Sequence, residues 1–507
     1  MTVNHDHSGI KRRTILKTIG AGAVGVAGLL GASGTAAAVG YTNPQYEPHF
    51  PDPTIYNDDG TYYAYGTNMD RDDGSNDSQE LLVPILSSTD LVNWTYEGEA
   101  FTSRPGWVYG SIWAPDIHRY NGQWVMFYSL RPRNGGEFGI GLATSDSPTG
   151  PFTDHGRVIS DSDHENGGTI DAYFVEHNNT PYLFFGSFHG IYLIELTPDL
   201  QSWHPSSYTQ VAGNAYEGAI HFEANEYHYL MPSTGGCCDG LASTYEYEIG
   251  RSTSFSGPYY NQNGTDLMNR NANNKGVPVL TGNRRFPGPG HGDVMRYDDG
   301  SLWTVYHAYD AQDGGWVDGV PRRVLLMDRI EWENDWPVIG CTNTPTEAAQ
   351  APGSASNCTG PVSGPLPEGT YHITNVNSSK LLEVANAGTE NGTTVQQYAD
   401  TGCTCQQWNL SQNRDGTYHI TNVNSGLYME VVDAEYGDGA NIQQFERSGH
   451  PCQRWNVIDN GDGTYRLEAE HSGTVADVYN AQTSDGANVI QWSYWGGDNQ
   501  KWTFESV

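Results

Sequence analysis

The sequence predicts an all-β protein with more than one domain, because its 507 residues exceed the length of one ordinary domain. Short aromatic segments, such as 61–65 and 123–128, directly follow the turn pairs Asp59-Gly60 and Asn121-Gly122. Strand-like residues next to such pairs are typical of β-hairpins. Outside the N-terminus, no long stretch carries apolar residues at sustained helical spacing. From residue 368 onward a set of residues recurs every 47 positions, which marks a second folded region.

Residues 1–38 are predicted to be an export signal. Lys11-Arg12-Arg13-Thr14 form a twin-arginine motif, an apolar glycine-rich segment covers 19–30, and Ala36-Ala37-Ala38 suggest a cleavage site. The apolar segment is shorter than the ~20 residues that a membrane span needs. A single N-terminal anchor helix is the alternative. We therefore expect an extracellular protein with no membrane association after cleavage.

The chain is strongly acidic, with 60 Asp and Glu against 25 Lys and Arg and a formal net charge of -35. Such a polyanion repels nucleic acid and anionic membranes, so neither is an expected partner. Lysine is especially scarce, which favours adaptation to molar salt, where surface repulsion is screened within roughly 3 Å. An ordinary acidic secreted protein is the alternative. The oligomeric state stays open.

Residues 41–340 contain recurring strand–turn units, and residues that could carry chemistry open successive units. These residues are Asp52, Asp116, Asp171, Glu217 and His291. Five units of four short strands fit a β-propeller. Because the innermost strands of a propeller line one channel, acids far apart in sequence would converge there.

Three carboxylates, Asp52, Asp171 and Glu217, stand in similar settings, each followed by an aromatic, strand-like run. Cleavage of a glycosidic bond needs one carboxylic acid to protonate the leaving oxygen and one carboxylate to activate water or attack carbon. A third acid nearby can keep the pKa of the proton donor raised by like-charge repulsion. The alternative is that each is a solvated turn acid.

Several separated motifs surround these acids. They are His49-Phe50-Pro51-Asp52-Pro53, Trp113-Ala114-Pro115-Asp116-Ile117, Ile170-Asp171, Phe185-Gly186-Ser187-Phe188, Glu217, Gly236-Cys237-Cys238, Gly290-His291 and His307-Ala308-Tyr309. In number and order they resemble glycoside hydrolase family 43, and most closely its endo-arabinanases, over about Glu47 to Gly340. The resemblance implies a five-bladed β-propeller whose site lies at the end of the central channel, and an inverting mechanism.

The resemblance also implies roles for single residues. Asp52 would be the general base, Glu217 the general acid and Asp171 the residue that adjusts the pKa. His291 would hold a metal ion, usually calcium, partly through water. The chain departs from the family pattern at Ala172 and at Gly218-Ala219, where proline is common.

Further residues near the motifs are candidates for substrate binding: Phe50, Trp113, Asp116, Thr169, Ser187, Phe188 and His189. The aromatic ones could stack on a furanose or be plain core. Ser187 and His189 could donate hydrogen bonds to sugar hydroxyls. For Asp116, support of the blade and channel is the alternative to a role as a fourth site acid.

Residues 341–367 are rich in Ala, Pro, Ser, Thr and Gly and are interpreted as a linker, or as an irregular cap on the propeller. From 368 to 507, Gly369-Thr370-Tyr371 and Gln406-Gln407-Trp408 each recur twice at the same spacing. Three copies that end in Gln-x-Trp resemble a ricin B-type lectin domain. The resemblance implies a β-trefoil in which these tryptophans are core.

Sugar contacts in the trefoil are expected at other repeated positions. Acidic residues recur at Glu383, Glu430 and Asp477, and aromatic residues at Tyr398, Phe445 and Trp492. An aromatic face can lie under the C–H groups of a sugar while a carboxylate accepts its hydroxyls. The third repeat keeps the family's Asp, so Asp477 and Trp492 form the preferred pocket, whereas Glu383 and Glu430 could be purely structural.

Seven cysteines leave at least one without an intramolecular partner. Cys341 and Cys358 could pair, and the adjacent Cys237 and Cys238 are interpreted as a local loop feature. The sequence as a whole predicts a secreted, halophilic hydrolase that cleaves α-1,5-linked arabinan internally and binds plant polysaccharide through its trefoil. The alternatives are an exo-acting α-arabinofuranosidase or β-xylosidase, and a non-catalytic carbohydrate-binding protein. An invertase-like propeller is disfavoured by the motifs.

Overall fold

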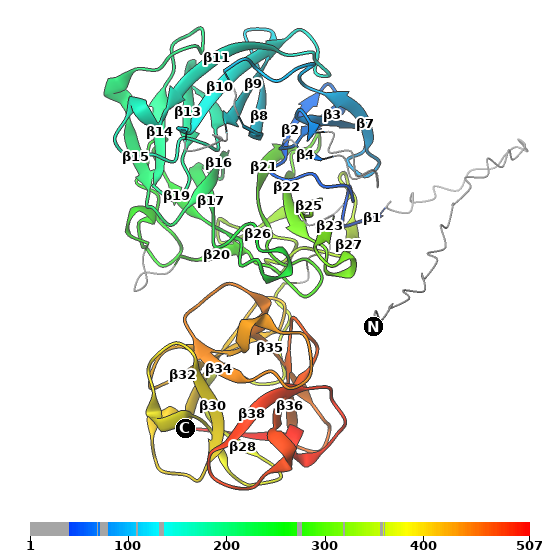
Figure 1. The fold of residues 1–507 in the computed structure, drawn as a ribbon, viewed down its shortest axis with the longest axis vertical. Coiled ribbons are helices and arrows are strands. Elements are labelled where there is room, and N and C mark those ends of the chain that lie inside the picture. Colours follow the sequence, from blue (N-terminus) through cyan, green and yellow to red (C-terminus); the bar gives the residue numbers. More distant parts are fainter. Residues whose placement is uncertain are drawn as a thin grey trace, which may run out of the picture. The chain divides into compact units, whose positions relative to one another are not determined.

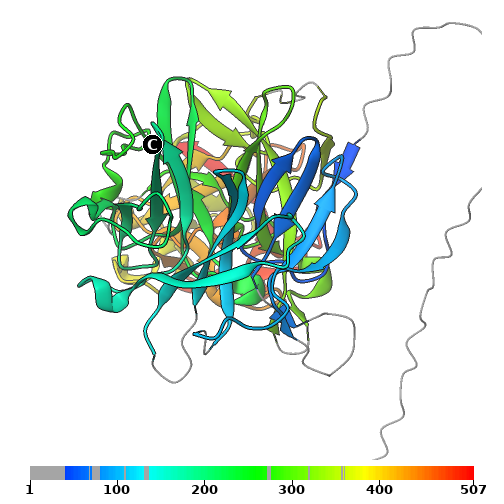
Figure 2. The ribbon, with the colours of Figure 1, turned by 90° about the horizontal axis from the view of Figure 1, so that it is seen from above.

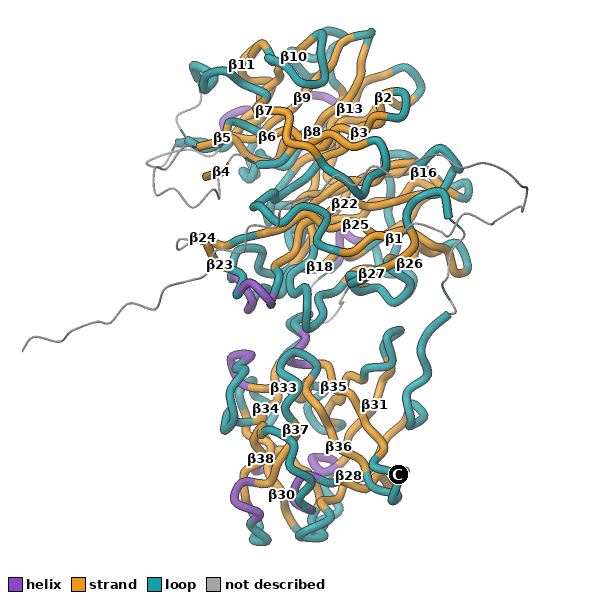
Figure 3. Tube along the Cα trace, turned by 90° about the vertical axis from the view of Figure 1, so that its right-hand side faces the viewer, coloured by secondary structure: helices purple, strands orange, loops and turns teal. Residues whose placement is uncertain are grey.

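The computed structural model describes residues 40–507 apart from 68, 71–79, 108–109, 131–135, 271–275, 318–319, 355–357 and 359. Strands dominate these residues, and the helices among them are 3-10 turns of three residues each (Figure 3). The predicted export signal lies outside the described residues. Within them, no helix has the length and apolar character needed to cross a membrane.

The first folded region is a five-bladed β-propeller, as predicted (Figure 1). Its blades are, in chain order, β2 (Thr54–Asp58), β3 (Thr61–Tyr65), β6 (Pro84–Ser88) and β7 (Thr95–Glu99); β8 (Ile112–Tyr120), β9 (Gln123–Leu130), β10 (Gly139–Ser145) and β11 (Thr153–Ser160); β12 (Tyr173–His177), β13 (Thr180–Phe185), β14 (Ile191–Glu195) and β15 (Thr209–Ala212); β16 (Glu217–Ala224), β17 (Tyr227–Thr234), β18 (Glu246–Glu248) and β20 (Pro278–Leu280), with β19 (Gly250–Ser252) beside β17; and β21 (Gly290–Arg296), β22 (Leu302–Tyr309), β25 (Arg323–Glu333) and β26 (Trp336–Ile339). The strands within each blade are antiparallel.

Smaller elements decorate the propeller. They are the strand pairs β1 (Gly40–Thr42) with β27 (Ala348–Gln350), β4 (Met69–Asp70) with β5 (Glu80–Leu81), and β23 (Trp316–Val317) with β24 (Val320–Pro321), and the 3-10 turns η1 (Asp161–Asp163), η2 (Pro205–Ser207), η3 (Gly240–Ala242), η4 (Leu267–Asn269) and η5 (Ala311–Asp313).

The predicted hairpin turns form where the sequence places them. Asp59 and Gly60 join β2 to β3 with φ of 49° and 89°, and Asn121 and Gly122 join β8 to β9 with φ of 50° and 84°. Positive φ at both central residues gives a turn whose twist matches that of the flanking strands, and Asn, Asp and Gly adopt it at least cost. Local turn chemistry therefore sets the register of these innermost hairpins.

Aromatic side chains fill the spaces between neighbouring blades. Phe127 of β9 stacks on Phe174 of β12 with ring centroids 5.6 Å apart and planes inclined by 17°. Both belong to one buried cluster that combines residues of the second and third blades. The other buried clusters of the propeller likewise combine residues of two neighbouring blades, so each blade buries apolar side chains against both of its neighbours.

The ring closes through the segment that precedes the first blade. Tyr46 forms a β-bridge with Leu325 of β25, and the Phe50 amide donates to the Arg323 carbonyl at 2.9 Å. The buried Asp293 of β21 accepts hydrogen bonds at 3.0 Å from the Thr54 hydroxyl and the Ile55 amide. In Figure 2 the blue strands of the first blade lie beside the green strands of the last. Every described blade uses one contiguous stretch of chain, so no blade combines strands from both ends of the propeller. The contacts of Tyr46, Phe50 and Asp293 therefore hold the first blade to the last.

The segment interpreted as a linker is partly built into the propeller. β27 pairs with β1, and the Ser354 carbonyl accepts a hydrogen bond from Arg329 at 2.7 Å. Cys341 and Cys358, which the sequence left as one of the open pairings, form a disulfide. The alternative of an irregular cap therefore describes this segment better, at least as far as Ser354.

The second folded region is a β-trefoil, as predicted. Its strands are β28 (Gly369–Asn375), β29 (Leu381–Val384), β30 (Thr393–Tyr398), β31 (Gln407–Gln412), β32 (Tyr418–Asn422), β33 (Tyr428–Val431), β34 (Ile442–Phe445), β35 (Arg454–Asp459), β36 (Tyr465–Ala469), β37 (Val475–Val478), β38 (Ala487–Trp492) and β39 (Trp502–Ser506), joined in part by the 3-10 turns η6 (Ala385–Ala387), η7 (Thr404–Gln406), η8 (Val432–Ala434), η9 (Pro451–Gln453), η10 (Tyr479–Ala481) and η11 (Asp498–Gln500). β28, β31, β32, β35, β36 and β39 pair in a closed ring, and the other strands form three hairpins.

The tryptophans of the Gln-x-Trp repeats lie in the core, as predicted. Trp408, Trp455 and Trp502 have no exposed surface. Each indole N–H donates to a backbone carbonyl of its own repeat, at 2.9, 2.9 and 3.2 Å respectively. A buried indole without such a partner would be destabilising. The repeated spacing therefore reproduces one local structure three times.

Trp455→Ala should lower the free energy of unfolding of the trefoil by about 3–5 kcal/mol, because it opens a cavity in the shared core. Denaturant unfolding followed by circular dichroism measures the change. Tyr479→Ala is the matched control, since Tyr479 is 45% exposed, and it should change stability by no more than about 0.5 kcal/mol. Equal losses in the two variants would contradict the core assignment.

Candidate active site

The propeller brings the three predicted acids together. Asp52 and Asp171 each lie two residues before the innermost strand of a blade, and Glu217 is the first residue of another. Figure 1 shows innermost strands of several blades around one axis. The charges of Glu217 and Asp52 both raise the pKa of Asp171, so the three carboxyl groups share one electrostatic environment. All three are at least nine-tenths buried.

Asp52 is held as a buried carboxylate. Oδ1 accepts from Arg323 Nη1 at 3.0 Å, and Oδ2 accepts from the Thr67 hydroxyl at 2.6 Å. The Asp52 amide donates to His307 Nδ1 at 3.1 Å. Burial alone would raise the pKa of Asp52, but Arg323, with His291 and His307, outweighs it and holds this pKa well below its usual value. Asp52 is therefore ionised throughout the neutral range.

The pKa of Asp171 is shifted in the opposite direction to that of Asp52. Burial raises its pKa well above the usual value, and the nearby charges of Glu217 and Asp52 raise it further. Its own amide donates to the Ser129 hydroxyl at 2.8 Å, which fixes a backbone with φ of 62°. Buried carboxyl groups that repel one another tend to retain a proton. The site thus combines a firmly ionised acid with one that favours the protonated form.

Glu217 is oriented by two hydroxyl groups. Ser187 donates to Oε2 and Tyr245 donates to Oε1, both at 2.7 Å. Burial, followed by the charge of Glu217, raises the pKa of the Tyr245 phenol well above its usual value, so the phenol stays a neutral donor. Both carboxylate oxygens are therefore fixed by groups that carry no charge.

His291 lies beside Asp52 and against the residue that follows Glu217. Its Nδ1 is 3.4 Å from Asp52 Oδ1, and its amide donates to the Ser233 hydroxyl at 3.0 Å. Gly218, directly after Glu217, has φ of 52°, and a Cβ there would be 2.8 Å from the His291 ring. Glycine at 218 therefore permits the close approach of this imidazole.

The expected calcium ion is only partly matched by the side chains at His291. Ca²⁺ takes six to eight oxygen ligands. His291 offers an imidazole nitrogen, while both oxygens of the adjacent Asp52 already accept from Arg323 and Thr67. Among the described residues here, a calcium ion would fit only if water supplied most of its shell.

Asp116 links two blades. Its Oδ2 accepts from the Phe174 amide at 2.6 Å, and Oδ1 lies 2.9 Å from His118 Nε2. Asp293 makes the equivalent connection from the last blade to the first, and its pKa is raised to about 6, chiefly by burial and then by the charge of Asp116. These contacts support the alternative that Asp116 braces the blades around the channel.

The other predicted substrate-binding residues separate into surface and core. Phe188 is 41% exposed, and His189 Nδ1 lies 3.0 Å from the Ser187 carbonyl. Trp113 is partly exposed in β8, next to a β-bulge. These positions remain available to a ligand.

The prediction that Phe50 and Thr169 bind substrate is corrected by the structure. Phe50 has no exposed surface and packs edge-on against Tyr46, so its ring has no face free for a sugar. Thr169 is likewise buried, and its hydroxyl donates to Asp161 Oδ1 at 2.7 Å. Both are structural residues: Phe50 supports the segment before Asp52, and Thr169 supports the one before Asp171.

Arg323, Thr67 and Tyr245 contact the acids but were missed by sequence reasoning. Thr67 also accepts a hydrogen bond from the Ala114 amide at 2.8 Å, and so connects Asp52 to the second blade. Arg323 follows another arginine, Arg322, and precedes the apolar run Val324-Leu325-Leu326-Met327, so no motif around it indicates a role at the site. Such an arginine becomes an expected partner only if Asp52 is first assumed to be buried and ionised, and the sequence does not show this.

In the trefoil, the repeated acids are already hydrogen bonded. Both oxygens of Glu383 accept from Gln396 and Gln406, at 2.7 and 2.9 Å, and Glu430 accepts in the same way from the glutamines of its own repeat. Asp477 Oδ1 accepts from Asn499 at 2.8 Å. All three acids are at least nine-tenths buried.

The repeated aromatic residues of the trefoil are more accessible than the acids. Trp492 is 38% exposed and Tyr398 is 36% exposed, and Phe445 is partly exposed. Asp477 pairs with Ile490 across the β37–β38 hairpin, so Asp477 and Trp492 point to the same side of it. The exposed ring of Trp492 and the carboxyl group of Asp477 therefore lie on the side of the hairpin where the preferred pocket is expected.

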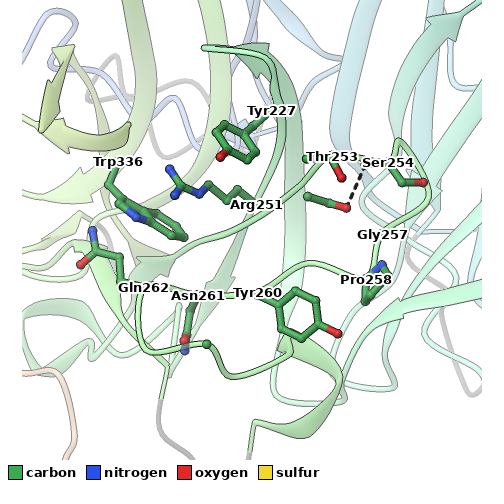
Figure 4. Close-up of a pocket in the computed structure, with 12 residues that line it drawn as sticks. Tyr227, Arg251, Thr253, Ser254, Gly257, Pro258, Tyr260, Asn261, Gln262 and Trp336 are labelled. Carbon is green, nitrogen blue, oxygen red and sulfur yellow. Dashed lines mark hydrogen bonds between the residues drawn. The ribbon is translucent and has the colours of Figure 1, made fainter. Parts of the chain in front are cut away.

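A surface hollow of about 480 Å³ lies elsewhere on the propeller, and none of the three acids lines it (Figure 4). Tyr227 and Trp336 flank Arg251, whose guanidinium carbon lies 4.2 and 4.3 Å from the two ring centroids. Arg251 also donates to the Asp335 carbonyl at 2.7 Å. The arginine is thus already engaged in joining strands of two blades.

Two family models match the chain. Residues 41–337 match glycosyl hydrolases family 43, and residues 362–445 and 451–507 match the ricin-type β-trefoil lectin domain-like family. The extracellular endo-α-(1→5)-L-arabinanase 1 of Bacillus subtilis is 34% identical over 56% of this chain and 86% of its own length. The extracellular exo-α-(1→5)-L-arabinofuranosidase of Cellvibrio japonicus is 30% identical over 57% and 85%. A solved structure of a Bacillus licheniformis endo-arabinanase is 32% identical over 58% and 98%, with a TM-score of 0.49.

Asp171→Asn should stabilise the propeller increasingly as the pH rises. The folded protein keeps a proton on Asp171 above the usual pKa of an aspartate, whereas the unfolded chain releases it, so stability falls with pH between the two pKa values. Asparagine does not titrate, so it removes this loss. The free energy of unfolding of the variant should gain on that of the parent by up to about 1.4 kcal/mol per pH unit within that window.

Melting temperatures of the parent and Asp171→Asn across pH 4 to 8 test this expectation. Asp59→Asn is the matched control, because Asp59 is exposed and also has positive φ. Its difference from the parent should not depend on pH. A constant difference for Asp171→Asn would show that Asp171 titrates normally.

Proposed function

Because the chain belongs to glycosyl hydrolases family 43, we propose that its propeller hydrolyses α-1,5-linked arabinan, within the polymer and with inversion. The observation that carries the proposal is the contrast among three buried carboxyl groups: Asp52 is held ionised, while Asp171 has a raised pKa beside Glu217. Hydrolysis of a glycoside needs a carboxylate base and a carboxylic acid in one site, and the electrostatic environment of Asp171 includes both Asp52 and Glu217. The names of the similar proteins from Bacillus subtilis and Cellvibrio japonicus support arabinan as the substrate.

In this mechanism Asp52 is the general base. Its carboxylate would orient a water molecule and accept a proton as that water attacks the anomeric carbon. Arg323 and Thr67 fix the carboxylate, so its orientation is set before substrate binds. Inversion requires about 6.5–9.5 Å between base and acid, to leave room for the water.

Glu217 is the general acid, which protonates the leaving oxygen. The hydroxyls of Ser187 and Tyr245 hold both of its oxygens in place. Asp171, whose pKa is raised by burial and then by the charges of Glu217 and Asp52, would adjust the proton affinity of the site, because interacting acids release their protons as a set. Phe188 and Trp113 would contact the furanose rings from the surface of the channel.

A calcium ion held by His291 through a mostly hydrated shell is part of the proposal. It would supply positive charge next to Asp52. The roles of Asp52 and Glu217 above do not depend on it. Removal of metal by a chelator, with activity and melting both measured, would establish its contribution.

An exo-acting α-arabinofuranosidase is the second candidate, because a similarly related protein carries that name. Endo and exo enzymes can share the same acids and differ in the loops that border the channel. The size of the first products separates the two candidates.

The trefoil is proposed to keep the enzyme on plant polysaccharide, and the chain is proposed to be secreted through the twin-arginine route and to work in molar salt. The extracellular relatives favour secretion. The net charge of -35 favours a saline environment. Loss of cooperative folding on dialysis into dilute buffer, with calcium present, would support the adaptation to salt.

Incubation of the mature protein with linear α-1,5-arabinan in multimolar salt should release oligosaccharides of mixed length at early times. Asp52→Asn and Glu217→Gln should each lower the rate by at least about 100-fold with the fold retained. Asp59→Asn, an exposed acid, is the control and should leave the rate unchanged. Arabinose as the first and only product would indicate an exo-enzyme. If neither arabinan nor xylan gives any product, the protein would be a non-catalytic carbohydrate-binding protein.

Trp492→Ala should weaken retention on insoluble arabinan by roughly 2- to 12-fold, the factor that corresponds to about 0.5–1.5 kcal/mol of aromatic contact. A pull-down at constant salt measures the bound fraction. Tyr260→Ala removes a 45% exposed aromatic residue of the propeller and should have no effect. Unchanged retention of the Trp492 variant would rule out this pocket.

A further inference from the structure

Two neighbouring blades bring imidazole and carboxylate groups together at their hairpin turns. His177 is the last residue of β12 and precedes the turn Asn178-Asn179. Glu223 of β16 and His228 of β17 are directly paired across the next blade's hairpin. Glu223 lies six residues along β16 from Glu217, which places this cluster ~20 Å from the catalytic acid. The cluster is therefore separate from the active site.

The donor atoms of these residues converge. Glu223 Oε1 lies 3.2 Å from His228 Nδ1 and 3.7 Å from His177 Nδ1. One ligand atom of each residue lies within 4.8 Å of the others. Ligands bound tetrahedrally at 2.0–2.2 Å are separated by roughly 3.3–3.5 Å, so only small side-chain rotations are needed to seat one ion among the three.

Packing holds both imidazoles in place. His177 stacks on Phe255 with centroids 4.2 Å apart and planes inclined by 4°. Its Nε2 lies 2.9 Å from the Asn178 side-chain amide. Because an asparagine amide can be turned over, its oxygen can accept the Nε2 proton, which leaves Nδ1 free as a ligand. Such an outer hydrogen bond is typical of metal-binding histidines.

His228 Nδ1 is a buried nitrogen that lacks a hydrogen-bond partner within the described part of the chain, since its 3.2 Å approach to Glu223 is poorly aligned. The His228 ring stacks on that of His221, with centroids 5.4 Å apart and planes inclined by 28°. A ring nitrogen that is not engaged in a hydrogen bond can serve as a metal ligand when the imidazole is neutral.

We propose that His177, Glu223 and His228 form a binding site for Zn²⁺ or a similar first-row divalent ion. Two imidazoles and one carboxylate are a common zinc set, and water would complete the coordination. Glu223 has a 60% exposed side chain, and a hollow of about 590 Å³ lined in part by both histidines opens the site to solvent. The bound ion would fasten the third blade to the fourth at these hairpin turns, so its effect is on stability rather than on turnover.

Metal uptake by the full mature protein tests the proposal. After exhaustive chelation, equilibrium dialysis against Zn²⁺ should give the parent one more bound equivalent than His228→Ala, His177→Ala or Glu223→Gln, each of which should bind at this site at least roughly tenfold more weakly. Co²⁺ in place of Zn²⁺ should give the parent, but not these variants, the strong visible absorption of four-coordinate cobalt. The melting temperature should rise with added Zn²⁺ only when the site is intact.

Two controls make the outcome specific. His155→Ala removes a surface histidine elsewhere on the propeller and should bind as the parent does. His291→Ala removes the histidine beside Asp52, so any ion bound there is lost while this site remains. Glu223→Gln alters a mostly exposed side chain and should fold normally, which keeps the test valid if a histidine variant is unstable. Equal zinc uptake and equal cobalt spectra for the parent and Glu223→Gln would overturn the proposal.

Discussion

The buried ion pair between Arg323 and Asp52 is the interaction on which the organisation of the propeller centre depends. Burying a lone carboxylate is costly, and its pKa would rise until it took up a proton. The guanidinium reverses that tendency. The Arg323 backbone also accepts from the Phe50 amide and donates to His49 Nδ1, so one residue both closes the ring of blades and keeps the base charged.

The same logic explains why the acids differ although their sequence settings are alike. Asp52 faces Arg323 and two imidazoles, Asp171 faces two other carboxyl groups, and Glu217 faces two neutral hydroxyls. The backbone supplies similar positions at the inner ends of three blades, and the residues opposite decide the proton affinity of Asp52 and Asp171. A propeller suits this division, because every blade delivers a side chain to the same axis from a different neighbourhood.

Features with local causes could be predicted from the sequence, and those that depend on ring closure could not. Asp59-Gly60 and the Gln-x-Trp repeats act within a few residues or repeat at a fixed spacing, so turns, blades and trefoil core followed from pattern and resemblance. The Arg323–Asp52 pair spans 271 positions and has no local signal. Phe50 and Thr169 were wrongly placed in the pocket because a motif shows which residues lie near a site but not which way they face. For residues 341–367 the sequence left a linker and an irregular cap as alternatives, because low complexity concealed the pairing of β27 with β1.

Closure of the ring by contacts between its two ends has a consequence for how the enzyme is made. Asp52 leaves the ribosome early, whereas His291, His307 and Arg323 belong to the last blade, so the base has none of these partners until nearly the whole propeller has been synthesised. A nascent chain that stops short of the fifth blade would carry all three acids and still lack the groups that orient Asp52 and keep it charged when buried. The site of Asp52 is therefore completed only when the fifth blade folds against the first.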